Sequence, residues 1–440
     1  MSTSFRPYHP DQSLLLPPSP REWLPEDHLA FFVSDTVDAL DLSAFYERYE
    51  GDGRRNQPFD PRMMVKLLVY GYATGTFSSR RIAARLQDDV AFRVLSAGNC
   101  PAHRTIAEFR QRHLSEFESL FIQVVRMAGE LGLLKLGTIA VDGSKVKANA
   151  SKRKAMSYGR MVQEEKRLKR EIRAILRRAK KTDAHEDVEF GPDFRGDELP
   201  EELARRQSRL EQIQAAKKRL EARQEEADRA SGRSPDDEDK PGKSGPKFKR
   251  RFGHPPDHTQ DNFTDPDSRI MKDSRGFEQC YNAQIAVDSD AQMIVAVGVT
   301  QTPSDQPELL PLIDKVHAVT GQGPNRVLAD AGYRSEKNLR ALQERGIDGY
   351  VAIGRDNGKP MKIREEQIAT LQMDRKMRTK RGRARYRKRK GIAEPVFGWI
   401  KSCMGFRNFS LRGHEKVTAE WCLVSLAMNL RRLNERMAWT

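Results

Sequence analysis

The chain has 440 residues, of which 38% are hydrophobic and 32% charged, and its mean hydropathy is −0.73. This length excludes a single small module and allows two or three domains, while Lys and Arg outnumber Asp and Glu by 16. Such a basic chain favours a polyanion as its partner, no apolar run is long enough to span a bilayer, and the first residues do not resemble a signal peptide. We therefore expect a cytoplasmic protein with no membrane partner.

The first 130 residues are expected to form a helical domain, because apolar residues recur there at helical spacing. Asp60 and Pro61 are the residue types favoured at a helix N-cap and first helical position, and apolar residues follow them. A second helix is predicted after Ser78 and Ser79.

A third helix is predicted from Thr105, since Thr105 and Glu108 have the spacing of a capping box. Arg104 and Arg110 lie around this helix, so its exposed side is a candidate to contact a DNA backbone or major groove, as in a helix-turn-helix. The alternative is a helical bundle with ordinary surface arginines.

From residue 137 onward the hydrophobic pattern becomes that of strands. The first and fourth predicted strands each end at an acid, Asp142 and Asp330. Helical spacing separates the later strands, and the second and third read as a hairpin. The predicted strands are residues 138–141, 281–287, 293–299, 327–329 and 350–353.

A long polar insertion separates the first two strands. Residues 160–228 are rich in Lys, Arg, Glu and Gln and predict two helices that pair as an antiparallel arm. Residues 229–262 are rich in Ser, Pro, Gly and charge, which predicts a flexible connector. One arm helix carries a stripe suited to contact between two molecules: Leu203, Leu210, Ile213 and Leu220.

This order of elements predicts the α/β class: a ribonuclease-H-like mixed sheet with an N-terminal helical domain and a long helical, coiled-coil-like insertion after the first strand. In that topology the first and fourth strands are neighbours. The expected domains are an N-terminal helical DNA-binding domain (1–130), a catalytic domain in two parts (131–150 and 263–440), and the arm with its linker (151–262).

Asp142 and Asp330 would then meet at one sheet edge, and Glu394 opens an apolar helix further on. Phosphodiester chemistry by two Mg²⁺ ions needs such hard oxygen ligands. Taken singly, each acid is better explained as an ordinary turn residue or, for Glu394, as an acid favoured at a helix N-terminus.

Several motifs together resemble the DDE transposases of bacterial insertion sequences, in particular the insertion sequence eleven-eighty-two group near the four/five-like superfamily. The resemblance covers nearly the whole chain, and its most specific element is a C-terminal signature of Tyr386, Arg389, Glu394 and Lys401, in which the spacing from Arg389 to Glu394 is one residue longer than usual. The stretches that carry it are DPRMMVKLLVYGYATGTFSS, IAVDGSKVKAN, TDPDSRIM, LADAGYRS and YRKRKGIAEPVFGWIK.

The resemblance implies that Asp142, Asp330 and Glu394 are catalytic and hold Mg²⁺, for which Mn²⁺ could substitute, while Lys401 and Tyr386 lie by the DNA phosphates. For Lys401 the helical spacing agrees, because seven residues after Glu394 is two turns along the same face. Lys401 could instead simply extend into solvent at the end of an amphipathic helix.

Residues 376–390 contain ten basic residues and no acid. We interpret this run as a clamp on the phosphate backbone, with a solvated basic loop as the alternative. The residues expected to bind DNA there, besides Arg389, are Arg383, Arg385, Arg387 and Lys388.

The expected function is Mg²⁺-dependent cleavage of DNA at the ends of an insertion sequence, followed by joining of the 3′-hydroxyls to target DNA by two-metal-ion phosphoryl transfer. The alternatives are a catalytically inert DNA-binding protein derived from a transposase, and a ribonuclease-H-like nuclease without joining activity. The expected partners are element ends, target DNA and at least a second copy of the chain, in the bacterial cytoplasm at the nucleoid.

Overall fold

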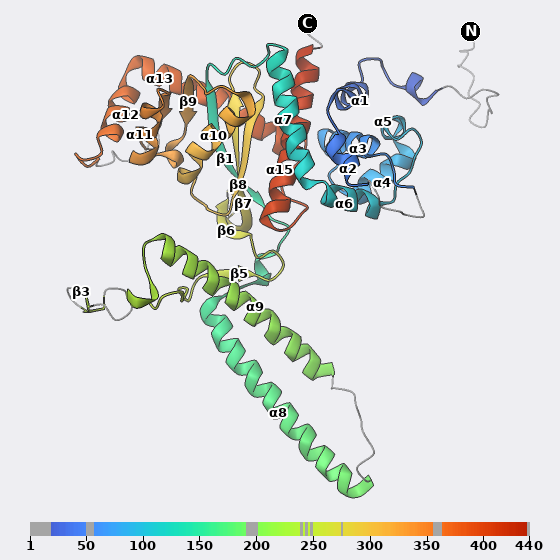
Figure 1. Ribbon diagram of the computed structural model, residues 1–440, viewed down its shortest axis with the longest axis vertical. Helices are drawn as coiled ribbons and strands as arrows, with labels where there is room; N and C mark the ends of the chain where they lie inside the picture. Colours follow the sequence, from blue (N-terminus) through green and yellow to red (C-terminus); the bar gives the residue numbers. More distant parts are fainter. Residues whose placement is uncertain are drawn as a thin grey trace, which may run out of the picture.

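A computed structural model describes residues 19–49, 57–190, 201–237, 241–242, 245–246, 250–273, 276–354 and 363–437. A body of sheet and helices lies at one end of the molecule, and two long helices extend from it as an arm (Figure 1). No helix in these ranges is both long and apolar enough to cross a membrane.

The main sheet is mixed and confirms the α/β class. Its order is β10-β9-β1-β7-β6, and β8 also pairs with β7. β1 runs parallel to β9 and antiparallel to β7, so the predicted adjacency of the first and fourth strands is confirmed. The strands are β1 (Ile139–Lys147), β6 (Arg269–Asp273), β7 (Gly276–Asp288), β8 (Ile294–Thr300), β9 (Arg326–Ala329) and β10 (Asp348–Val351).

β1 is longer than its sequence predicts. The β-branched run was expected to end at Asp142, but the strand continues for five residues to Lys147, paired throughout with β7. Pairing with β9 stops at Val141, opposite Ala329. Asp142 is therefore the first residue of β1 beyond its parallel partner rather than the last residue of the strand.

Apolar helices enclose this sheet and join it to the N-terminal part in one core. Trp421 of α15 is fully buried, and its indole N–H donates to the carbonyl oxygen of Gln284 in β7 at 3.1 Å. The remaining helices of the body are α7 (Leu114–Glu130), α10 (Leu309–Thr320), α11 (Glu336–Glu344), α12 (Ile368–Arg378), α13 (Lys380–Arg387), α14 (Ala393–Gly398) and α15 (His414–Met437).

The N-terminal region is helical, as predicted, and Asp60 caps its helix by accepting a hydrogen bond from the Arg62 amide at 2.7 Å. The predicted start of the third helix is wrong: it begins at His103, and Thr105 lies within its first turn without capping it. The helices here are α1 (Leu29–Ala39), α2 (Ser43–Glu47), α3 (Pro61–Ala73), α4 (Ser79–Asp88), α5 (Val90–Leu95) and α6 (His103–Arg112).

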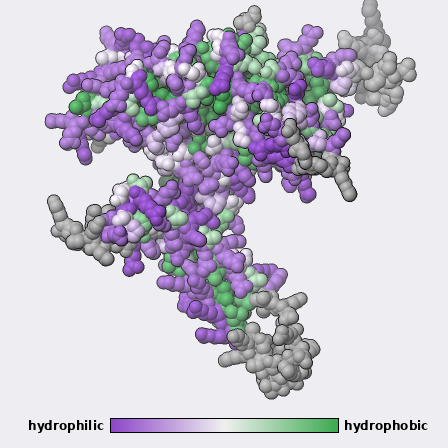
Figure 2. All heavy atoms as spheres, viewed as in Figure 1, coloured by the Kyte–Doolittle hydropathy of each residue, from purple (hydrophilic) through white to green (hydrophobic). Residues whose placement is uncertain are grey.

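The arm consists of α8 (Tyr158–Phe190) and α9 (Glu201–Ala230), which pack on each other around a small core separate from that of the body. The prediction that the leucine and isoleucine stripe of α9 joins two molecules is wrong, because the stripe packs within one chain. Leu203, Ile213 and Leu220 are at most 2% exposed within the single chain, and Leu210 is half-buried. The face of the arm seen in Figure 2 is mostly hydrophilic.

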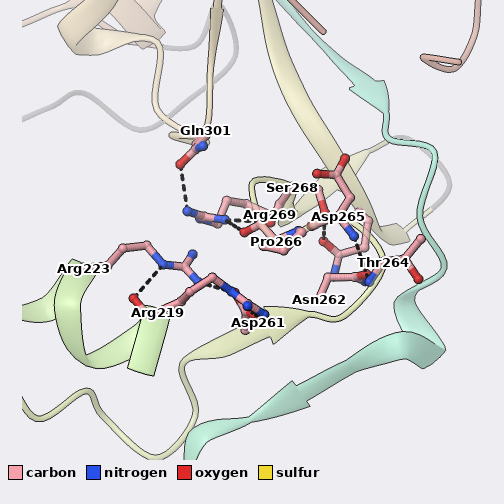
Figure 3. A network of polar contacts seen from close by, with 11 residues as sticks. Arg219, Arg223, Asp261, Asn262, Thr264, Asp265, Pro266, Ser268, Arg269 and Gln301 are labelled. Atoms are coloured by element: carbon pink, nitrogen blue, oxygen red, sulfur yellow. Dashed lines mark hydrogen bonds and ion pairs between the residues drawn. The ribbon is translucent and has the colours of Figure 1, made fainter. Parts of the chain in front are cut away.

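The described part of the expected flexible linker is anchored at the root of the arm. β5 (Gln260–Asn262) pairs with β2 (Ala155–Ser157), and the buried carboxylate of Asp261 pairs with Arg219 at 2.6 Å and with Arg223, both from α9 (Figure 3). Arg250 likewise binds Asp228 at 2.7 Å. These ion pairs hold residues 250–262 against α9. The predicted flexible connector is therefore wrong for this part of the segment.

Candidate active site

Two of the predicted acids lie at one edge of the sheet. Val141 of β1 is paired in parallel with Ala329, the last residue of β9. Asp142 and Asp330 are the next residues after these two, so they lie at the same level along neighbouring strands. Asp330 also caps a short 3-10 turn, accepting a hydrogen bond from the Gly332 amide at 2.8 Å.

Glu394 reaches the same edge through an arginine. It lies in the first turn of α14, half exposed, and one of its oxygens is 3.3 Å from the guanidinium of Arg389. The other terminal nitrogen of Arg389 is 3.5 Å from Asp142. Arg389 is thus a buried cation between two of the three acids, and its contact with DNA stays a prediction.

The environment of Asp142 disfavours its charge. Burial raises the pKa of Asp142 to about 6, with Arg389 opposing the rise and Asp330 and Glu394 adding to it. The effect of the two acids on this pKa arises because like charges close together resist ionisation. Perturbed carboxylates of this kind are concentrated at functional sites.

Lys401 lies close to this edge. Its ammonium donates a hydrogen bond to the hydroxyl of Ser144, two residues beyond Asp142 on β1, and lies 5.9 Å from the centre of the Phe397 ring. The segment Trp399–Cys403 is a π-helical turn, not the regular α-helix that the sequence spacing assumed. Tyr386 is near the same edge, because the guanidinium of Arg389 lies over its ring, 6.0 Å from the ring centre.

The basic run at residues 376–390 is helical rather than a loop. Its side chains differ in whether they are free to contact DNA. Arg385 is tied to Asp348 at 3.0 Å and to the Tyr350 hydroxyl at 2.8 Å. In contrast, the remaining three clamp candidates are exposed: Arg383, Arg387 and Lys388.

The two arginines of α6 have opposite environments. Arg104 is exposed, as predicted. Arg110 is only 6% exposed and donates hydrogen bonds to the Tyr72 hydroxyl at 2.9 Å and to the Phe77 carbonyl oxygen at 3.0 Å. Its predicted place on a DNA-contacting surface is therefore wrong, because the guanidinium is used inside the core.

A fourth acid near the site escaped the sequence reading. Asp305 accepts hydrogen bonds from Lys145 at 3.0 Å, Asn282 at 2.6 Å and Gln284 at 2.8 Å, and Gln284 in turn accepts one from the buried Tyr333 hydroxyl. Lys145 lies three residues after Asp142. The spacing of Asn282 and Gln284 on β7, facing one way from a buried strand, is the signal that would have indicated a polar network.

The three carboxylates are donors of the type that Mg²⁺ takes, and the crowding of Asp142 by two further acids favours a bound cation. Among the described residues, no three His, Cys, Asp or Glu side chains lie close enough to hold one ion together. The guanidinium of Arg389 supplies positive charge between Asp142 and Glu394. The carboxylates match Mg²⁺ in donor type, but they do not surround a single position, because the guanidinium of Arg389 lies between Asp142 and Glu394.

The sheet and its acidic edge, flanked by basic helices, define a protein suited to act on a polyanion. Comparison with known families makes the class definite: a model described as Transposase DDE domain matches residues 252–430, and one described as Transposase domain (DUF772) matches residues 18–112. The chain belongs to the DDE transposases of bacterial insertion sequences. Its narrower placement in the eleven-eighty-two group stays a prediction.

A curated relative agrees with this family. The chain is 36% identical over 74 residues to a Burkholderia cepacia protein assigned as the transposase of insertion sequence element IS402. The match covers 16% of this chain and 35% of that protein, so the chain spans about a third of the relative it matches. No solved structure matches the chain.

Proposed function

We propose that this transposase cleaves DNA at the ends of its insertion sequence and joins the freed 3′-hydroxyls to target DNA. The observation that carries the proposal is the acidic edge: Asp142 and Asp330 on adjacent parallel strands, with Glu394 linked to Asp142 through Arg389. In the sheet, β1, β6 and β8 all pair antiparallel with β7, and β9 and β10 add in parallel beside β1; this arrangement supports a ribonuclease-H-like catalytic domain.

In this proposal Asp142, Asp330 and Glu394 hold Mg²⁺. When bound, the metal stabilises negative charge on the reacting phosphate and lowers the pKa of an attacking water. Lys401, held by Ser144, offers a positive charge to a neighbouring phosphate. Arg389 orients Glu394 toward the edge and offsets part of the repulsion among the acids.

The test uses one protein preparation and a DNA fragment that carries the gene with the terminal inverted repeats expected to bracket it. Asp142→Asn, Asp330→Asn and Glu394→Gln should each abolish nicking at the repeats while leaving the gel shift largely intact, because only metal coordination is lost. A variant that nicks at near wild-type rate in Mg²⁺ would remove that residue from the site.

The same assay addresses the alternatives. A wild-type protein that binds the repeats without nicking them would be the inert derivative, and one that nicks without producing joined products would be a nuclease. Pairing of two element ends by two copies of the chain also belongs to the proposal, and sedimentation of the protein with end DNA measures it.

A further inference from the structure

A basic groove lies beyond the acidic edge, between the sheet and the root of the arm. Its volume is about 680 Å³. Five cationic residues line it beside a single acid, Glu278. The cations are Lys147, Lys152, Arg153, Lys154 and Arg412.

The cations of this groove are largely uncommitted to carboxylates among the described residues. Glu278 lies 3.6 Å from Lys147 and 3.9 Å from Lys152, which is too far for a normal hydrogen bond to either. The side chains of these two lysines are 47% and 59% exposed. Arg153 and Lys154 are also exposed and have no ion pair with a described acid. The groove therefore carries an excess of positive charge open to a ligand.

The backbone around the groove is held in place before any ligand binds. The Phe409 amide donates to the Lys147 carbonyl at 2.8 Å, and Arg412 donates to the Asn149 carbonyl at 2.9 Å. On the other side, the Phe263 amide donates to the Lys154 carbonyl at 3.1 Å. Segments from three distant parts of the chain thus form one preorganised surface.

The groove begins further along β1 than the acids of the candidate active site. Lys147 is five residues beyond Asp142, which is about 17 Å along a strand. Ser144, which accepts a hydrogen bond from Lys401, lies between them on the strand. Because successive side chains of a strand point to opposite faces, Asp142 and Lys147 leave β1 on opposite sides, and the spacing along the strand sets no base-pair register between them.

The chemistry of the lining selects a phosphate backbone. No aromatic residue lines the groove among the described residues, so it offers no platform for stacking unpaired bases. Its uncharged lining residues are all small (Ala, Asn, Ser and Thr), so the groove offers no large apolar side chain to a protein or lipid partner. Phosphates of an intact duplex fit both observations.

We propose that Lys147, Lys152, Arg153, Lys154 and Arg412 form a second DNA-binding groove, which holds the phosphate backbone of a duplex between the sheet and the root of the arm. The inference rests on the proposed function, because it takes DNA as the substrate of the acidic edge. It adds a contact surface separate from the basic helices at residues 376–390.

The test measures binding of the full-length protein to a mixed-sequence 40-base-pair duplex at several salt concentrations. In the triple variant Lys152→Gln/Arg153→Gln/Lys154→Gln, the slope of log affinity against log salt should become shallower by about 2 to 3, since each lost phosphate contact removes about 0.9. Lys135→Gln/Lys337→Gln/Arg340→Gln removes the same charge from exposed sites away from the groove and should leave the slope nearly unchanged.

A second variant acts in the opposite direction. Glu278→Gln removes the single acid of the groove and should tighten duplex binding several-fold. The groove proposal is wrong if the triple variant keeps the wild-type slope, or if both triple variants lower it equally. If the wild type nicks element ends and the groove variants bind duplex as the wild type does, the proposed function stands and only the groove proposal fails. If the wild type binds no duplex, both proposals fail.

Discussion

At the scale of single residues, the most informative group is Asp142, because its burial and its neighbours both act on its charge. A carboxylate whose pKa is raised to about 6 costs the folded protein stability whenever it is ionised. That cost is acceptable at a site where a cation offsets it. The residue thus links the local electrostatics of the edge to the metal-dependent chemistry proposed for it.

The raised pKa of Asp142 predicts the pH dependence of stability in the metal-free protein. Between about pH 4 and pH 6, the folded protein holds a proton that the unfolded chain has lost. The free energy of unfolding therefore falls as the pH rises through this window. We expect Asp142→Asn to be more stable than the wild type at pH 7.5, by up to about 3 kcal/mol, and to lose this advantage near pH 4.

Thermal melts in EDTA across this pH range measure the effect, and Asp348→Asn provides a control of opposite sign. Burial alone would raise the pKa of Asp348, but hydrogen bonds from Lys376 and Arg326 lower it overall. Its contribution to stability is present at neutral pH and is lost as the pH falls, so this variant should melt below the wild type at pH 7.5. An Asp142→Asn protein that also melts lower at pH 7.5 would contradict the raised pKa.

Two arginines on one helix should separate DNA binding from folding. Arg110→Gln removes two buried hydrogen bonds and leaves the buried Tyr72 hydroxyl without its donor, so we expect a loss of about 3 kcal/mol in stability. Arg104→Gln, on the exposed side of the same helix, should leave the melt unchanged and weaken DNA binding. Urea unfolding and gel shifts of the two variants make the comparison; equal stability of both would refute the assignment of Arg110 to the core.

At the scale of elements, the sequence was most informative where local pattern decides structure. The caps at Asp60 and the short apolar strands were predictable because their residue types fix local geometry. The extension of β1 to Lys147 was not, because Gly143, Ser144 and Lys145 are not strand-forming residues and adopt this conformation through pairing with β7.

The site was predictable only in part for the same reason. Asp142 and Asp330 each follow a short apolar run and were visible in the pattern, whereas Asp305 meets Lys145 across 160 positions of sequence. The burial of Arg110 was equally hidden. Its Tyr72 partner is 38 residues away, and that hydroxyl donates to Glu420, 348 residues further on from Tyr72.

The basic helix α13 and the turn that follows it yield a prediction at this scale. Arg383, Arg387 and Lys388 are exposed, so replacing all three with Gln should make the salt dependence of DNA binding shallower by about 2 to 3. Arg385→Gln should behave differently, because this side chain is bound to Asp348 and Tyr350: it should lower the melting temperature and change the slope little. Anisotropy titrations at four salt concentrations measure both, and an unchanged slope in the triple variant would mean that the run is a solvated surface.

At the scale of the whole molecule, the arm and the body are joined at a narrow root. The two have separate apolar cores. The chain leaves the body at Lys154 and returns at Phe263, where the Phe263 amide donates to the Lys154 carbonyl oxygen at 3.1 Å. The insertion therefore begins and ends at one place, and its own packing makes it a separate module of the same chain.

This geometry predicts that the arm can be removed without unfolding the body. Replacing residues 155–262 with a short Gly/Ser linker should keep a cooperative melt near that of the full-length protein, because the linker has only to span the hydrogen-bonded pair Lys154 and Phe263. Nicking at the acidic edge should persist weakly, since Asp142, Asp330 and Glu394 all remain. The arm's apolar stripe is buried within one chain, so any loss of paired-end complexes in the deletion would come from the exposed, charged face of the arm.

Loss of the cooperative melt would mean instead that the insertion supports the fold of the sheet. In that case Asp261→Asn, which breaks the ion pairs with Arg219 and Arg223 while keeping the chain intact, should lower the melting temperature of the body as well.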